Sequence, residues 1–153
     1  MSSLPSQIQA PARSPHVLIV DDNEINHRVV SAICDLAGFT CEGVFTGHEA
    51  IRAVASGSFD LVLMDICMPE MDGIAASAGI RALGPLAARL PIIAVTANAE
   101  APDRARYAVA GMCAVVSKPI HVAALCEAMQ RAIADGDAGA QPDAEPGFDQ
   151  ARG

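Results

Sequence analysis

The chain has 153 residues, a length that suits a single domain with short flanking segments. Hydrophobic residues make up 52% of it and aromatic residues only 3%, so alanine, valine, leucine and isoleucine must fill any core. The formal net charge of −8 disfavours binding to the phosphate backbone of nucleic acids, and no apolar run of about 18 residues is present that could cross a membrane.

The first segment, residues 1–15, is rich in serine, proline and glutamine, and we interpret it as flexible. It has no basic start followed by an apolar block, so it does not resemble a secretory signal. The β-branched run HVLIVDD at 16–22 then predicts a strand. Apolar residues at helical spacing follow: Ile25, Val29, Ile33 and Leu36. They predict a helix with Asn23 as its N-cap and Gly38 as its end.

A half-exposed strand is predicted at 39–44, because apolar and polar residues alternate in FTCEGV. The next helix should begin at Thr46, which forms a capping-box pair with Glu49. Strands and helices then continue to alternate, with strands at 60–65, 90–97 and 113–119 and helices at 73–83, 100–110 and beyond 121. One face of the last helix is predicted to be apolar: Val122, Leu125, Met129 and Ile133.

The chain therefore reads as five rounds of strand then helix over residues 16–134. Strands that are apolar on both faces and separated by helices indicate a parallel sheet covered on both sides, which is an α/β fold. Residues 135–153 are rich in Gly, Pro and Asp with few apolar anchors, and we interpret them as a disordered acidic tail.

The five cysteines contain no C-x-x-C pair and are odd in number. This pattern argues against a disulfide framework and against a zinc site. It favours reduced thiols that act as small hydrophobic residues, and we therefore expect a cytoplasmic protein. The four histidines share no metal-ligand spacing, so we expect surface or capping histidines; His27 would lie in the middle of the first helix.

Four of the predicted strands end on polar side chains: Asp21 and Asp22, Asp65, Thr96, and Lys118. In an open parallel sheet the carboxyl ends of all strands lie on one rim, so these groups should meet there. Three neighbouring acids raise one another's pKa unless a cation neutralises them. Oxygen ligands suit a hard divalent ion, so Asp21, Asp22 and Asp65 predict a site for Mg²⁺ or Mn²⁺.

The remaining two groups suit phosphate chemistry. Lys118 supplies a point charge for a phosphate oxygen, and the Thr96 hydroxyl can donate to another. A carboxylate that faces a metal ion, a lysine and a threonine is placed to attack phosphorus and form an acyl phosphate. Asp65 is the acid presented alone at the middle of the rim, so it is the predicted nucleophile.

Four segments, VDDNEIN, LVLMDICMPEMDG, PIIAVTANA and SKPI, are similar to the receiver domain of two-component response regulators. The resemblance covers the whole predicted domain. It implies a flavodoxin-like (βα)5 fold, a doubly wound five-stranded parallel sheet in the order 2-1-3-4-5. It also implies that Asp22, Asp65 and the backbone carbonyl of Cys67 ligate the metal, that Asp21 acts through water, and that the Lys118–Pro119 bond is cis.

The same resemblance implies a signalling module, and not a conventional enzyme, which catalyses its own phosphorylation and dephosphorylation at Asp65. The phosphoryl group would come from a histidine kinase or a histidine phosphotransfer protein that docks near the first helix. Phosphorylation would then switch the binding of a downstream protein target. The chain would be a stand-alone regulator, or a domain of a hybrid sensor whose parent protein is a histidine kinase.

One position departs from the family pattern: Val115 stands three residues before Lys118, where the family usually has an aromatic residue. Output is therefore expected to rely on loop movement. Two alternatives remain. A haloacid-dehalogenase-type phosphatase would need a second aspartate where Cys67 stands, and a receiver-like module that is never phosphorylated usually lacks an acid or the lysine, all of which are present here.

Overall fold

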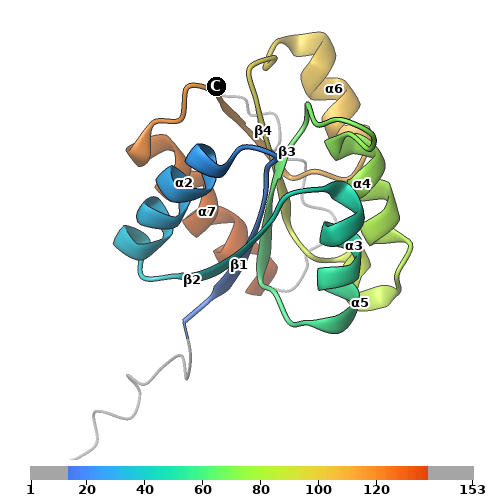
Figure 1. Ribbon diagram of the computed structural model, residues 1–153, viewed down its shortest axis with the longest axis horizontal. Helices are drawn as coiled ribbons and strands as arrows, with labels where there is room; N and C mark the ends of the chain where they lie inside the picture. The colour runs from blue at the N-terminus through green and yellow to red at the C-terminus, as the bar shows by residue number, and fades with distance from the viewer. Residues whose placement is uncertain (1–13, 138–153) are drawn as a thin grey trace, which may run out of the picture.

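Five strands form one parallel sheet in the order β2-β1-β3-β4-β5 in the computed structural model, which describes residues 14–137 (Figure 1). The α/β fold was predicted from the alternation of strands and helices, and this strand order was implied by the family resemblance. The strands are β1 His16–Val20, β2 Thr40–Val44, β3 Leu61–Asp65, β4 Ile92–Thr96 and β5 Ala114–Ser117. Our predictions for the flexible first segment up to residue 13 and for the tail from residue 138 lie outside the described residues.

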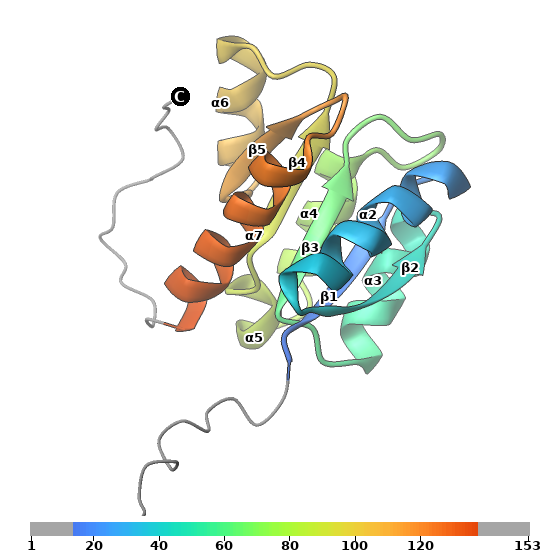
Figure 2. The same cartoon turned by 90° about the vertical axis from the view of Figure 1, so that its left-hand side faces the viewer.

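Helices cover both faces of the sheet. Figure 2 shows α2 (Glu24–Ala37) and α7 (Val122–Asp137) in front of the strands. The opposite face carries α3 (Gly47–Ser56), α4 (Gly73–Arg81), the short α5 (Pro85–Ala88) and α6 (Ala101–Val109). Within the described range, no helix is both long and apolar enough to span a bilayer.

The central strands are buried on both sides, as their continuous apolar sequences predicted. Every residue of β3 and β4 is buried. Because successive side chains of a strand point to opposite faces, β3 supplies Leu63 to one core cluster and Met64 to the other. The edge strand β2 is mostly exposed, in agreement with its alternating sequence.

Local capping signals place the first two helices. The Asn23 side chain accepts hydrogen bonds from the backbone N–H groups of Ile25 and Asn26, and Gly38 ends α2 in the left-handed conformation at φ 84°. The Thr46 side chain accepts from Glu49 N–H. The Glu49 carboxylate accepts from Phe45 N–H, one residue before the N-cap at Thr46.

Two helices differ from what their sequence patterns suggested. The predicted helix over 73–83 ends at Arg81, and Pro85 then starts the separate helix α5, which suits a proline because the first helical residue needs no N–H donor. The face of α2 that meets the sheet includes one residue of the apolar spacing noted in the sequence, Ile33. It carries His27, Val30, Ile33 and Cys34, while Ile25, Val29 and Leu36 are 68%, 43% and 73% exposed.

The last helix follows its predicted face in part. Leu125 and Met129 are fully buried, whereas Val122 at the start of α7 is 48% exposed. The helix continues to Asp137, beyond the predicted domain limit at residue 134. The domain limits themselves stay predictions.

Candidate functional site

Three acids meet at the carboxyl ends of β1 and β3. Asp21 and Asp22 directly follow β1, and Asp65 is the last residue of β3. One carboxylate oxygen from each lies within 4.8 Å of the others. Asp21 and Asp65 are buried, with 4% and 3% of their surface exposed, whereas Asp22 is exposed. The cluster is therefore closed on the protein side and open to solvent at Asp22.

Lys118, which directly follows the edge strand β5, brings a positive charge to this cluster. Its Nζ lies 3.1 Å from Asp65 Oδ1 and 3.8 Å from Asp21 Oδ2. Lys118 N–H also donates to the carbonyl of Thr96, which fixes the residue after β5 against β4. The Lys118–Pro119 peptide bond is cis, as the resemblance implied.

The charge balance at Asp65 is unfavourable to its ionised form. Burial and the Asp21 carboxylate raise the pKa of Asp65, and the opposing charge and hydrogen bond of Lys118 do not cancel them. One ammonium group thus faces three carboxylates. A set of oxygen ligands this close together, with negative charge left uncompensated, fits a hard divalent cation such as Mg²⁺.

The loop after Asp65 explains why the strand ends so abruptly. Gly73 N–H donates to the carbonyl of Ile66 over 2.9 Å, which folds residues 66–73 back onto the strand end. A Cβ at Gly73 would overlap the carbonyl oxygen of Asp65, so glycine is required for this close approach. Cys67 lies in this loop with its side chain exposed; the metal-ligand role of its carbonyl stays a prediction.

Two neighbouring residues of α2 hold Asp21 in place. The Asn26 amide nitrogen lies 3.2 and 3.1 Å from the two carboxylate oxygens of Asp21. The His27 Nε2 lies 2.8 Å from the Asp21 backbone carbonyl. Because a carbonyl can only accept, His27 Nε2 carries the proton. Asn23 N–H completes the set by donating to Asp21 Oδ1 over 2.9 Å.

No sequence pattern pointed to Asn26, and the expectation of a surface or capping His27 was wrong. His27 is buried, with 8% of its surface exposed, because β2 has Gly43 opposite its ring. A Cβ at Gly43 would overlap the His27 ring. A glycine inside a predicted strand signals such a close approach, so Gly43 was the available clue.

Thr96 lies at the same end of the sheet but faces a different set of partners. Its side chain is buried, and Oγ1 accepts a hydrogen bond from Asn98 N–H over 3.0 Å. The hydroxyl of Tyr107 lies 3.5 Å from the same oxygen. Among residues 14–137, the hydrogen bonds of Thr96 Oγ1 join it to these two groups and not to the acids.

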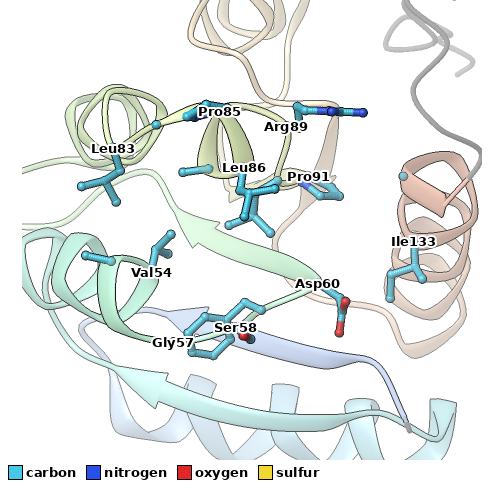
Figure 3. Close-up of a pocket in the computed structure, with 16 residues that line it drawn as sticks. Val54, Gly57, Ser58, Asp60, Leu83, Pro85, Leu86, Arg89, Pro91 and Ile133 are labelled. Atoms are coloured by element: carbon cyan, nitrogen blue, oxygen red, sulfur yellow. The ribbon is translucent and has the colours of Figure 1, made fainter. Parts of the chain in front are cut away.

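A hollow lies at the end of the sheet opposite to the acidic cluster. It has a volume of about 600 Å³ and is bordered by the segments that precede β3 and β4, together with α5 and the ends of α3 and α7 (Figure 3). Figure 3 shows Val54, Leu83 and Leu86 around it. Its charged lining residues are Asp60 and Arg89, and none of the predicted site residues borders it.

Comparison with known proteins places these features in context. Residues 17–130 match the family described as the response regulator receiver domain. The chain is 39% identical over 127 residues to the two-component system protein A of Emericella nidulans, covering 78% of this chain and 18% of that protein. It is 40% identical over 111 residues to the sensor protein GacS of Pseudomonas syringae, covering 71% of this chain and 12% of that protein. The chain thus spans less than a fifth of these relatives.

Solved structures show the same fold. The receiver domain of the sensor histidine kinase PA1611 from Pseudomonas aeruginosa, solved with a magnesium ion coordinated in its active-site cleft, is 36% identical, with a TM-score of 0.73 over 79% of this chain and 98% of that one. The chemotaxis protein CheY4 of Vibrio cholerae is 25% identical, with a TM-score of 0.74 over 78% of this chain and 98% of that one.

Proposed function

The chain belongs to the response regulator receiver family, and from this premise we propose that it accepts a phosphoryl group on Asp65 from a histidine kinase or a histidine phosphotransfer protein. One observation carries the proposal: the buried Asp65 carboxylate lies within an acidic cluster and is bonded to Lys118. This arrangement combines a nucleophile with a cation that can bind the incoming phosphoryl group.

In the proposed reaction, an Asp65 carboxylate oxygen attacks the phosphorus of a phosphohistidine. The new O–P bond forms as the N–P bond to the donor imidazole breaks, and the imidazole nitrogen keeps the electron pair. Lys118, 3.1 Å from Asp65, would neutralise charge on a phosphoryl oxygen, and the Thr96 hydroxyl would donate to another. A magnesium ion held by Asp22, Asp65 and the Cys67 carbonyl, with Asp21 acting through water, would supply the positive charge that the cluster lacks.

We propose that the phosphoryl donor docks on the start of α2. Ile25 and Val29 are 68% and 43% exposed and lie one turn apart on this helix. Ile25 is next to Asn26, whose amide contacts Asp21, so a partner bound there would reach the acids. A partner protein bound there would bury both apolar side chains, which favours association.

The output of the module would be a shift between two arrangements of its surface. A phosphoryl group on Asp65 changes this equilibrium only by binding the two arrangements with different affinity. The downstream protein target would recognise the arrangement favoured by phosphorylation. We propose that phosphorylation and target binding take place in the cytoplasm, where the five free cysteines would stay reduced.

Incubation with acetyl phosphate and Mg²⁺ tests the proposed function. We expect one phosphoryl group to be added, as measured by intact-protein mass spectrometry, and Asp65→Asn to abolish the addition. Equal labelling of Asp65→Asn would contradict the assignment. Rapid turnover of many phosphate esters would favour the dehalogenase-type phosphatase, and no labelling at all would favour a receiver-like binding module.

A further inference from the structure

Tyr107 is a buried tyrosine on α6 whose hydroxyl reaches the end of β4. Only 1% of its surface is exposed, and it is the single tyrosine of the chain. The hydroxyl donates to the backbone carbonyl of Asn98 over 2.9 Å, and it lies 3.5 Å from Thr96 Oγ1. The side chain therefore ends beside a group that the proposed reaction uses.

The two contacts of the Tyr107 hydroxyl differ in kind. The hydroxyl has one proton, and the Asn98 carbonyl can only accept, so the 2.9 Å contact takes that proton. Toward Thr96, the Tyr107 oxygen is then left as an acceptor. A separation of 3.5 Å is longer than an ordinary O–H···O hydrogen bond, so this second contact is weak.

The backbone of Asn98 links Thr96 to Tyr107 through two hydrogen bonds. Its N–H donates to Thr96 Oγ1 over 3.0 Å while its carbonyl accepts from Tyr107, so one residue bonds to both side chains. Arg104, also on α6, holds the next carbonyl, that of Ala99, over 2.7 Å. Helix α6 thus grips the loop after β4 at two successive carbonyls, and this loop in turn fixes the Thr96 hydroxyl.

We propose that Tyr107 is a positioning residue that holds Thr96 in its unphosphorylated arrangement and transmits a displacement of Thr96 to α6. The inference rests on the proposed function, because Thr96 must move toward a phosphoryl group on Asp65 for its hydroxyl to donate there. That movement stretches the bond to Asn98 and removes the contact with Tyr107. Helix α6 then loses part of its attachment to the loop.

This role also accounts for the departure at Val115. Val115 packs against the core cluster that contains Tyr107, but it has no hydroxyl with which to contact Thr96. Tyr107 supplies that hydroxyl from a helix instead of from β5. Output would therefore appear at the β4–α6 loop and along α6.

Tyr107→Phe tests the inference because it removes the hydroxyl and keeps the ring in the core. A bond that stabilises only the unphosphorylated arrangement opposes phosphorylation, so its loss should raise the rate of labelling by acetyl phosphate about two- to tenfold. Arg106→Ala is the matched control. Its guanidinium lies 6.0 Å from the centre of the Tyr107 ring, and its loss leaves the hydroxyl untouched.

A double-mutant cycle with Thr96→Val separates positioning from a general loosening of the fold. We expect Tyr107→Phe to leave the low residual rate of the Thr96→Val protein unchanged, because the residue that it positions is no longer functional. An equal rise in both backgrounds would overturn the inference. A rate for Tyr107→Phe equal to or below that of the wild type would overturn it as well.

An NMR measurement on the wild-type chain supports the test without any variant. Addition of beryllofluoride with Mg²⁺ should shift the Tyr107 ring signals and the amide signals of 98–107. Unchanged Tyr107 signals in a chain that binds beryllofluoride would contradict the inference. Failure of the wild type to be labelled at Asp65 would instead contradict the proposed function, so the two failures are distinguishable.

Discussion

The imidazole of His27 donates a hydrogen bond of 2.8 Å to the backbone carbonyl of Asp21, at the residue where β1 passes into the acidic cluster. The ring is held from two other sides. Phe45 lies with its ring centre 4.3 Å from that of His27, and Gly43 leaves room for the ring against β2. The position of the Asp21 main chain is therefore set by a buried side chain of α2.

Loss of this hydrogen bond should weaken metal binding. We expect His27→Phe, which keeps the ring volume, to lower the affinity for Mg²⁺ by about 10-fold, since groups that orient metal ligands typically contribute 10- to 100-fold. Isothermal titration of the unphosphorylated chain with MgCl₂ measures this affinity directly.

Two variants control that experiment. His27→Gln retains an N–H donor on a flexible side chain and should recover part of the affinity, whereas His48→Phe, at an exposed histidine of α3, should change nothing. Equal Mg²⁺ affinity in the wild type and His27→Phe would show that the bond does not position the site.

Glycine at position 73 should be essential to the site. We expect Gly73→Ala to lower the free energy of unfolding by about 1–3 kcal/mol, because the added Cβ meets the backbone of Asp65 and Ile66, which cannot rotate away. The same variant should lose labelling of Asp65 by acetyl phosphate, because the strand end has to shift. Denaturant titration and mass spectrometry measure the two effects.

Gly38→Ala is the matched comparison. Gly38 has φ 84° and open space where its Cβ would be, so the change should lower stability by about 1 kcal/mol through backbone strain alone. Because Gly38 lies at the end of α2 that is remote from the acids, labelling of Asp65 should be retained. Full labelling of Gly73→Ala would mean that the loop tolerates a Cβ beside Asp65.

The sequence was informative wherever local patterns decide the outcome. Apolar runs that end in a polar residue located the ends of β1 and β3, and the topology of a parallel sheet brought Asp21, Asp22 and Asp65 together as predicted. Capping signals at Asn23 and Gly38 gave the ends of α2. The strand order came from the family resemblance, since the alternation of strands and helices allows other orders.

Sequence patterns did not predict which side of a helix packs against the sheet. Helical spacing showed that apolar residues recur in α2, but it did not show which face meets the sheet. As a result Ile25 was counted with the apolar pattern although it is exposed, and His27 was assigned to the surface although it is buried. Tyr107 was missed because its contact with Thr96 joins a helix to a strand end and leaves no local signal.

The raised pKa of Asp65 predicts how stability depends on pH. An acid with a pKa above its unfolded value of about 3.9 binds protons more tightly in the folded chain, so stability falls as pH rises from about 4 through the raised pKa. Asp65→Asn removes this ionisation. We expect it to raise the melting temperature at pH 7, with a gain that shrinks toward pH 4.

Thermal unfolding of both proteins across this pH range, without added metal, checks the sign. Addition of MgCl₂ at pH 7 should raise the melting temperature of the wild type and reduce the advantage of Asp65→Asn, because a cation offsets the same repulsion. A gain for Asp65→Asn that is constant from pH 4 to pH 7 would exclude ionisation of Asp65 as its cause.

The exposed apolar side chains of α2 predict a separation between two kinds of phosphoryl donor. Ile25→Ala removes apolar area and leaves the charge of the site unchanged, so labelling by acetyl phosphate should stay the same. Transfer from a phosphorylated histidine phosphotransfer protein should slow by about 10-fold, since truncation of a central interface residue costs more than 1 kcal/mol.

Leu86→Ala, at an 85% exposed leucine of α5 beside the opposite hollow, should affect neither rate. If Ile25→Ala slowed both donors equally, its effect would lie in the acidic site; if Leu86→Ala alone slowed protein transfer, the donor would dock at the other end of the sheet.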